Sequence, residues 1–169
     1  MMTRRFLASV GLGGLAAAWA GLPAAGGSRG KQQPSDAEEV FPVAFSDAEW
    51  RKRLTPQQYD VLRQEGTEPA FTSPLLHEAR RGTFLCAGCD LALFSSETKF
   101  DSGTGWPSFW APLDKAVGTT RDSSYGMVRN AVHCSRCGGH LGHVFDDGPK
   151  PTGLRYCMNG VAMTFKPAA

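Results

Sequence analysis

The 169-residue sequence has no extended run of lysine and arginine, and its 18 basic residues nearly balance its 16 acidic ones. This absence removes the main sequence signal for a nucleic-acid partner. The chain also lacks the compositions of fibrous and disordered proteins, since 41% of its residues are hydrophobic and 10% are aromatic. With 20 glycines and 11 prolines, it is expected to form one loop-rich globular domain of catalytic size.

The N-terminus has the composition of an export signal. Arg4 and Arg5 precede an apolar, uncharged stretch at 6–22, and small residues follow it. An arginine pair next to a Phe-Leu pair resembles a twin-arginine signal, although the usual spacer is missing. A general secretory signal and an uncleaved anchor are the alternatives. We expect cleavage near Ala25, which makes 1–25 a signal peptide for export to the bacterial periplasm.

The remaining chain divides into a leader and a domain. Residues 26–42 lack apolar periodicity, which predicts a flexible leader. The folded domain is expected over residues 43–166.

Two helices are predicted at the start of this domain. Ser46 and Glu49 have the spacing of a capping box and open a helix that ends near residue 54. Thr55 followed by Pro56 opens a second helix, because proline is favoured at the first helical position. Gly66 is placed to end that second helix.

Short apolar runs dominate the chain after residue 82. Such runs, broken by glycine, proline, aspartate and serine, predict antiparallel strands. They lie at residues 83–85, 91–94, 108–110, 127–129, 131–133, 143–145, 154–157 and 161–165. The fold class is therefore expected to be mainly β or α+β, with two leading helices.

Four of the five cysteines form two Cys-x-x-Cys pairs, Cys86/Cys89 and Cys134/Cys137. Two such pairs supply the four thiolates that a structural zinc ion prefers. Because 44 residues separate the pairs, the ion would join segments distant in sequence. Two disulfides, or buried unreactive thiols, are the alternatives.

The fifth cysteine, Cys157, has no cysteine partner once the other four bind a metal. Arg155 and Asn159 flank it at a spacing that places all three on one face of a strand. A guanidinium beside a thiol favours the thiolate, which is the form that attacks electrophiles. A buried structural cysteine is the alternative reading.

Two further segments carry candidate functional side chains. His140 and His143 stand among glycines and can act as acids or bases near neutral pH, although metal ligation and a structural role are alternatives. The glycine-framed segment 103–110 contains three aromatic residues, among them Trp106. This segment suits either an exposed platform for a small apolar group or ordinary core packing.

Four motifs together resemble the B-type peptide methionine-(R)-sulfoxide reductases, and the resemblance covers residues 43–166. The motifs are Cys-Ala-Gly-Cys at 86–89, Lys-Phe-Asp-Ser-Gly-Thr-Gly-Trp-Pro-Ser-Phe at 99–109, Cys-Ser-Arg-Cys-Gly-Gly-His-Leu-Gly-His-Val-Phe at 134–145 and Arg-Tyr-Cys-Met-Asn at 155–159. Their order and spacing match the family, which makes chance agreement improbable.

The resemblance implies two small antiparallel sheets with N-terminal helices and one structural zinc on the four paired cysteines. Cys157 would attack the sulfur of a methionine-(R)-sulfoxide in an oxidised protein or peptide, leaving methionine and a cysteine sulfenic acid. The remaining groups would bind the substrate or assist the reaction. Trp106 and Phe145 would hold the methyl group, His143 or His140 would donate a proton, Asn159 would contact the S–O group, and Arg155 would favour the Cys157 thiolate.

Two positions depart from the family pattern. Thr104 stands where many relatives carry a resolving cysteine, and Gly160 stands where many have serine. Without a sixth cysteine, the sulfenic acid is expected to be reduced directly by an external thiol, either a thioredoxin-like protein or a small thiol. We expect a monomer. A zinc-ribbon-like interaction module and a cysteine-based redox sensor are the alternative functions.

Overall fold

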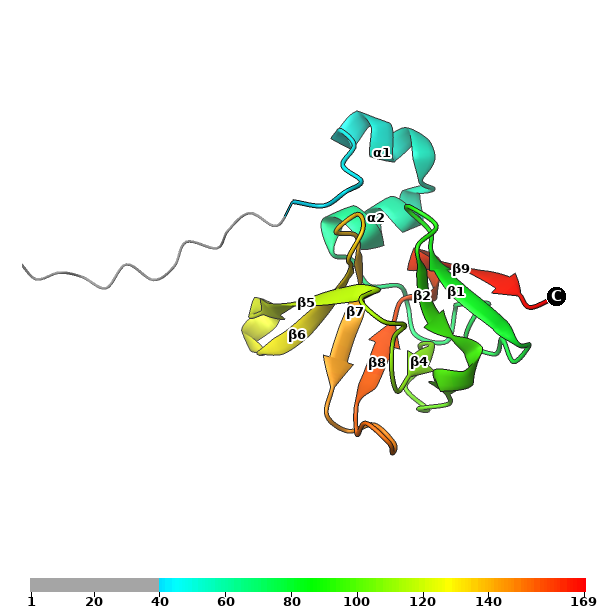
Figure 1. Ribbon diagram of the computed structural model, residues 1–169. Helices are drawn as coiled ribbons and strands as arrows, with labels where there is room; N and C mark the ends of the chain where they lie inside the picture. The colour runs from blue at the N-terminus through cyan, green and yellow to red at the C-terminus, as the bar shows by residue number, and fades with distance from the viewer. Residues whose placement is uncertain (1–39) are drawn as a thin grey trace, which may run out of the picture. The chain divides into compact units, whose positions relative to one another are not determined.

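The computed structural model describes residues 40–169, shown as the coloured ribbon in Figure 1. The predicted signal peptide and nearly all of the predicted leader lie outside these residues. Within the described part, two helices precede two antiparallel sheets of three and six strands. This architecture confirms the fold class expected from the sequence. No helix in this part is long and apolar enough to cross a membrane.

The two helices begin where the capping signals predicted them. Helix α1 covers Asp47–Arg53 and helix α2 covers Pro56–Gln64, and both carry a complete capping box. The end of α2 differs from the expectation, because Glu65 and not Gly66 adopts the left-handed conformation, with φ of 57°. Gly66 lies against Asp60 instead. A Cβ atom there would clash with the side-chain carboxylate of Asp60.

The sheets are built from nine short strands. The three-stranded sheet has the order β2-β1-β9, with β1 at Gly82–Cys86, β2 at Ala92–Ser95 and β9 at Met163–Pro167. The six-stranded sheet has the order β3-β4-β8-β7-β6-β5, with β3 at Lys99–Phe100, β4 at Ser108–Phe109, β5 at Val117–Asp122, β6 at Arg129–Cys134, β7 at His140–Phe145 and β8 at Arg155–Met158. Three 3-10 turns accompany them: η1 at Ser96–Thr98, η2 at Ser124–Gly126 and η3 at Gly160–Ala162.

The sequence-based strand assignment differs from the structure in several places, and it did not include the two-residue strand β3. Strand β5 was missed because it is an edge strand with several exposed residues, so it lacks the apolar alternation of a half-buried strand. Of the predicted strand at 127–129, only Arg129 lies in a strand, as the first residue of β6. Met127 and Val128 are exposed and connect η2 to β6. The predicted run at 161–165 is divided between η3 and β9.

An aromatic cluster forms the core between the sheets. Phe94 of β2 stacks on Phe109 of β4 at 4.4 Å between ring centroids, and Phe84 of β1 meets Phe109 edge-on at 4.9 Å. All three side chains are fully buried. Helix α2 contacts β7 and η3, and it contributes Val61 and Leu62 to the same buried cluster. The two sheets and the helices therefore share one core.

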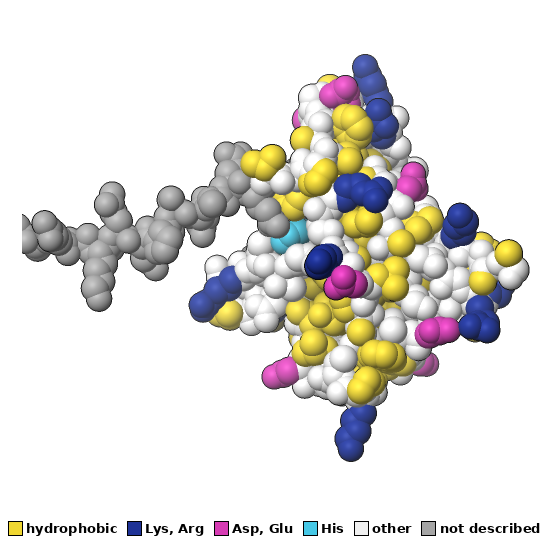
Figure 2. Space-filling model, in the orientation of Figure 1, with side chains coloured by type: hydrophobic (Ala, Val, Ile, Leu, Met, Phe, Trp, Pro, Cys, Tyr) yellow, Lys and Arg dark blue, Asp and Glu magenta, His cyan; other side chains and the backbone are white. Residues whose placement is uncertain are grey.

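Charged side chains of both signs are interspersed on the face shown in Figure 2. They do not gather into an extended basic surface there, which agrees with the charge balance of the sequence.

Candidate functional site

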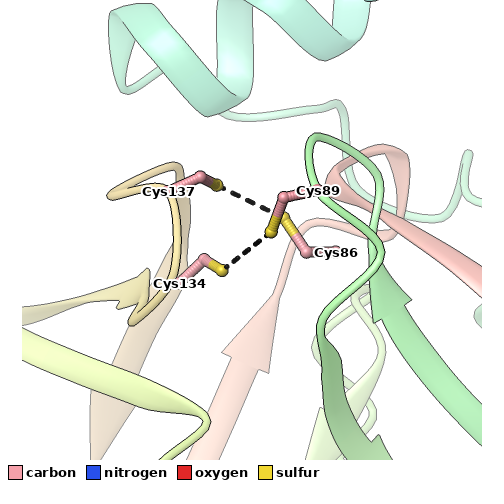
Figure 3. Close-up of side chains that lie close together, drawn as sticks. All are labelled: Cys86, Cys89, Cys134 and Cys137. Atoms are coloured by element: carbon pink, nitrogen blue, oxygen red, sulfur yellow. Dashed lines mark hydrogen bonds between the residues drawn. The ribbon is translucent and has the colours of Figure 1, made fainter. Parts of the chain in front are cut away.

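The four paired cysteines meet between the two sheets (Figure 3). Cys86 ends β1 and Cys89 lies in the turn that follows, whereas Cys134 ends β6 and Cys137 lies in the turn before β7. Their sulfur atoms all lie within 4.8 Å of one another. The cluster therefore connects the three-stranded sheet to the six-stranded sheet.

The sulfur spacing fits a metal ion and excludes disulfides. The Cys86 and Cys137 sulfurs are 3.7 Å apart, and the Cys89 and Cys134 sulfurs are 3.5 Å apart. Disulfide sulfurs lie at about 2.05 Å, so these cysteines are free thiols. A regular tetrahedron with metal–sulfur bonds of about 2.3 Å has edges of about 3.8 Å. The four residues thus have the donor atoms and the spacing for a tetrahedral metal site.

Crowding of the four sulfurs shifts their acidities apart. Hydrogen bonding to Cys134 raises the pKa of Cys86, and hydrogen bonding from Cys137 lowers the pKa of Cys134. The four sulfurs therefore oppose one another's ionisation while they share one small volume. A divalent cation would replace the thiol protons and stabilise all four thiolates at once.

The two cysteine turns are closed by different residues. Cys86 N–H donates to Leu91 and Asp90 N–H donates to Cys86, with Asp90 in the left-handed region at φ of 58°. In the second turn Gly138 has φ of 66° and donates to the Cys134 carbonyl. In both turns the residue in the left-handed region directly follows the second cysteine of the pair.

Strand register places Cys157 beside a histidine. Cys157 of β8 pairs with His143 of β7 on one side and with Ser108 of β4 on the other. Directly paired residues of antiparallel strands project to the same face of the sheet. Two residues further along each strand, and so on the same face, Arg155 pairs with Phe145. Cys157, His143, Arg155 and Phe145 therefore lie on one face of the sheet.

His143 is held by an ionised carboxylate. Its Nε2 lies 2.8 Å from Asp122, and Arg129 donates to the same carboxylate oxygen at 2.6 Å. Hydrogen bonds from Ser124, followed by the one with His143, hold the pKa of Asp122 well below its usual range. This contact fixes the orientation of the His143 ring at the sheet face, as a histidine that takes part in acid–base chemistry requires.

His140 has a different environment. Its side chain is buried, and its ring meets that of His143 edge-on at 5.3 Å between centroids. Burial, followed by the nearby His143, lowers the pKa of His140 to about 4, so this imidazole is neutral near pH 7. Its Nε2 has no hydrogen-bond partner among the described residues.

Arg155 lies against both an aromatic ring and an acid. Its guanidinium is 4.3 Å from the centre of the Phe145 ring and donates to Asp147 through two nitrogens at 2.8 and 2.9 Å. These ion-pair hydrogen bonds raise the pKa of Arg155, and Cys157 adds to the shift in the same direction. The guanidinium is therefore fixed as a cation near the Cys157 sulfur.

Trp106 and Asn159 are both anchored to the segment before β1. The Trp106 indole donates to the carbonyl of Glu68 at 3.0 Å, and Asn159 accepts from the Glu68 N–H at 2.9 Å. The other end of the Asn159 amide donates to Leu141 at 3.1 Å. Asn159 is buried and lies just beyond the end of β8. Its side chain thus binds backbone on both sides of the site. Of the three aromatic residues in 103–110, Phe109 belongs to the core.

The two departures from the family pattern both lie at this site. The Thr104 hydroxyl is 3.8 Å from the Cys157 sulfur, and it belongs to a hydroxyl chain through Ser102 to Ser108 with spacings of 2.8 and 2.7 Å. A Cβ atom on Gly160 would clash with the Ser73 hydroxyl oxygen. Ser73 therefore occupies the space that a side chain at position 160 would need.

Sequence reasoning missed Asp122, Arg129 and Glu68. Asp122 lies in the edge strand β5 and reaches His143 across β6, so no local spacing reveals the contact. Glu68 is 91 residues from its partner Asn159. Acidic residues are common near turns, so nothing in the sequence distinguishes Asp122 and Glu68 from ordinary surface carboxylates.

Comparison with known proteins identifies the family. A model described as the SelR domain matches residues 54–167. A peptide methionine sulfoxide reductase MsrB of Leptospira interrogans is 55% identical over 127 residues, which cover 75% of this chain and 97% of the relative. The protein with the same description from Agrobacterium fabrum is 57% identical over 126 residues, covering 74% of this chain and 93% of the relative. One from Methanosarcina barkeri is 56% identical over 125 residues, covering 73% and 88%. These matches confirm the resemblance found in the sequence motifs, and the chain belongs to the SelR-domain family of MsrB peptide methionine sulfoxide reductases.

Proposed function

We propose that this protein reduces the (R) epimer of methionine sulfoxide in oxidised proteins and peptides, with Cys157 as the nucleophile. The observation that carries the proposal is the direct pairing of Cys157 with His143 across β7 and β8, with Asp122 bound to Nε2 of that histidine. A nucleophile beside a carboxylate-oriented histidine is an arrangement suited to attack coupled to proton transfer.

The chemistry assigns a task to each group. The Cys157 thiolate attacks the sulfoxide sulfur, and the sulfur–oxygen bond breaks as the oxygen passes to the cysteine. Proton donation from His143 neutralises the charge on that oxygen, and the products are methionine and Cys157 sulfenic acid. His140 and Asn159 complete the polar side of the site, Arg155 favours the thiolate, and Trp106 with Phe145 bounds the methyl group. One positioned acid contributes about 10²- to 10⁴-fold to such a rate.

We propose zinc as the ion of the four-cysteine site. Four thiolates at tetrahedral spacing are the donor set that zinc prefers in structural sites, with no position left for substrate. The site is formed by one turn from each sheet and does not include Cys157, so the ion would stabilise the fold and take no part in the reaction.

The first prediction concerns stereochemistry. A synthetic peptide with one methionine sulfoxide, separated into its two epimers, is incubated with the protein and dithiothreitol, and methionine is measured by mass spectrometry. We expect turnover of the (R) epimer and less than about 1% of that rate with the (S) epimer, because the methyl group and the oxygen bind to opposite sides of the site. Preferential turnover of the (S) epimer would refute the assignment.

The second prediction concerns recycling, which we propose to be direct reduction by an external thiol. After one turnover without reductant, mass spectrometry should find sulfenic acid on Cys157 in the wild type. In a Thr104→Cys variant it should find a disulfide that joins position 104 to Cys157, since the Thr104 hydroxyl is only 3.8 Å from the Cys157 sulfur.

A disulfide in the wild type between Cys157 and any of the four clustered cysteines would contradict direct recycling. The external reductant supplies two thiols. The first condenses with the sulfenic acid and releases water, and the second frees Cys157 as a disulfide of the reductant forms. A thioredoxin-like protein or a small thiol meets this requirement.

Export and a monomeric state complete the proposal. The arginine pair and the apolar stretch at residues 6–22 support export to the periplasm. Fractionation of cells that produce the full chain, with and without Arg4→Lys and Arg5→Lys together, tests the twin-arginine route.

A further inference from the structure

Glu68 is a half-buried carboxylate whose task the proposed mechanism leaves open. It lies in a segment without regular secondary structure, between α2 and β1. Its two carboxylate oxygens accept hydrogen bonds from the first two N–H groups of η3, those of Gly160 and of Val161, the latter at 3.0 Å. The described lysines and arginines form no ion pair with it.

A carboxylate in this position carries an energetic cost. Burial raises the pKa of Glu68, and the two backbone hydrogen bonds from Gly160 and Val161 oppose that rise. An apolar or amide side chain would fill the same space without the cost of desolvating a charge. The geometry therefore points to a role that needs both carboxylate oxygens, one for each of the N–H groups of Gly160 and Val161.

The backbone of the same residue binds two other parts of the site. Its N–H donates to Asn159 at 2.9 Å, and its carbonyl accepts from the Trp106 indole at 3.0 Å. Asn159 and Gly160 follow Cys157 by two and three residues, whereas Trp106 lies in the loop that also holds Thr104. One residue thus connects the segment that follows the nucleophile to the aromatic side chain expected to hold the substrate methyl group.

We propose that Glu68 is a positioning residue that fixes the Trp106 indole relative to Cys157 by binding Asn159, Gly160 and Val161 on one side and Trp106 on the other. This role rests on the proposed function, because it assumes a substrate that lies between Trp106 and Cys157. Glu68 touches neither the reacting sulfur nor the oxygen. Its effect on the reaction passes through the residues that it holds.

The expected effect follows from the geometry of attack. The thiolate and the sulfoxide sulfur must approach in line, and misplacement of bound substrate by about 1 Å costs roughly 10²-fold in rate. Without the carboxylate, the N–H groups of Gly160 and Val161 lose their acceptors. They can turn to water, because Glu68, Gly160 and Val161 line an open hollow of 690 Å³. The segment can therefore shift while the core stays folded.

The test compares Glu68→Ala and Glu68→Gln with the wild type on the (R)-sulfoxide peptide. We expect kcat/KM to fall by about 30- to 100-fold in Glu68→Ala, mainly through kcat. Glu68→Gln keeps the length and one acceptor oxygen, so its loss should be smaller, about 3- to 10-fold. Glu97→Gln is the matched control, because Glu97 is an exposed carboxylate that pairs with Arg81 and makes none of these contacts, and it should match the wild type.

A second measurement separates positioning from general disruption. Alkylation of Cys157 by iodoacetamide needs the thiolate but not the Trp106 platform, so its rate should stay within about twofold of the wild type in both Glu68 variants. A kcat/KM equal to that of the wild type in Glu68→Ala would overturn the role of Glu68 and leave the proposed function intact. A loss of alkylation parallel to the loss of turnover would overturn it as well. If the wild-type protein does not reduce the (R) epimer, both the proposed function and this role of Glu68 are refuted.

Discussion

A Cys157→Ser variant is expected to lose at least about 10³-fold of its turnover of the (R)-sulfoxide peptide with dithiothreitol. A serine hydroxyl is far less acidic than a thiol, so it supplies almost no anion near pH 7 even beside the Arg155 guanidinium. The loss should appear in kcat, and so persist at saturating peptide, because the nucleophile acts in the chemical step. Steady-state assays with peptide saturation curves measure it.

The same variant should keep its fold and its metal. Cys157 lies outside the four-cysteine cluster and is only partly buried, so the exchange of sulfur for oxygen disturbs little packing. Metal content and the midpoint of thermal unfolding should equal those of the wild type. Residual turnover above about a tenth of the wild-type rate would mean that another group performs the attack.

A Cys134→Ser variant should show the opposite pattern. Loss of one thiolate from a tetrahedral site weakens metal binding, and binding of structural zinc contributes directly to folding free energy. We expect less than about half an equivalent of zinc per chain and a fall of about 10 °C or more in the midpoint of thermal unfolding. Elemental analysis and circular dichroism measure the two quantities.

Cys157→Ser and Cys134→Ser serve as controls for each other, since both replace a cysteine sulfur by oxygen but at different sites. Wild-type metal content and wild-type thermal stability in Cys134→Ser would contradict the metal site. Addition of a chelator to the wild type should reproduce the fall in stability and leave the unfolding of Cys134→Ser nearly unchanged.

The four clustered cysteines and the antiparallel fold could be predicted because their signals are local. Each Cys-x-x-Cys pair turns on itself, and strand β1 and the turn of Cys86 and Cys89 follow from a few adjacent residues. The capping boxes at Ser46 and Thr55 are local in the same sense, and both helices begin where they were expected.

The contacts that complete the site could not be predicted, because they join residues distant in sequence. Asp122 reaches His143 over 21 residues and Glu68 reaches Asn159 over 91. Neither contact has a periodicity that a single sequence reveals. Strand β5, which carries Asp122, was missed for the related reason that an exposed edge strand needs no apolar pattern.

The cysteine sulfur atoms of this domain are not equally accessible to oxidants. Cys86, Cys134 and Cys137 are buried, whereas Cys89 and Cys157 are partly exposed. Oxidation of Cys157 to the sulfenic acid is reversed by thiols, so it is part of a working cycle. Oxidation of Cys89 would instead remove one of the four donors that join the two sheets. The durability of this protein under the oxidants whose damage it repairs therefore depends on the single exposed edge of its metal site.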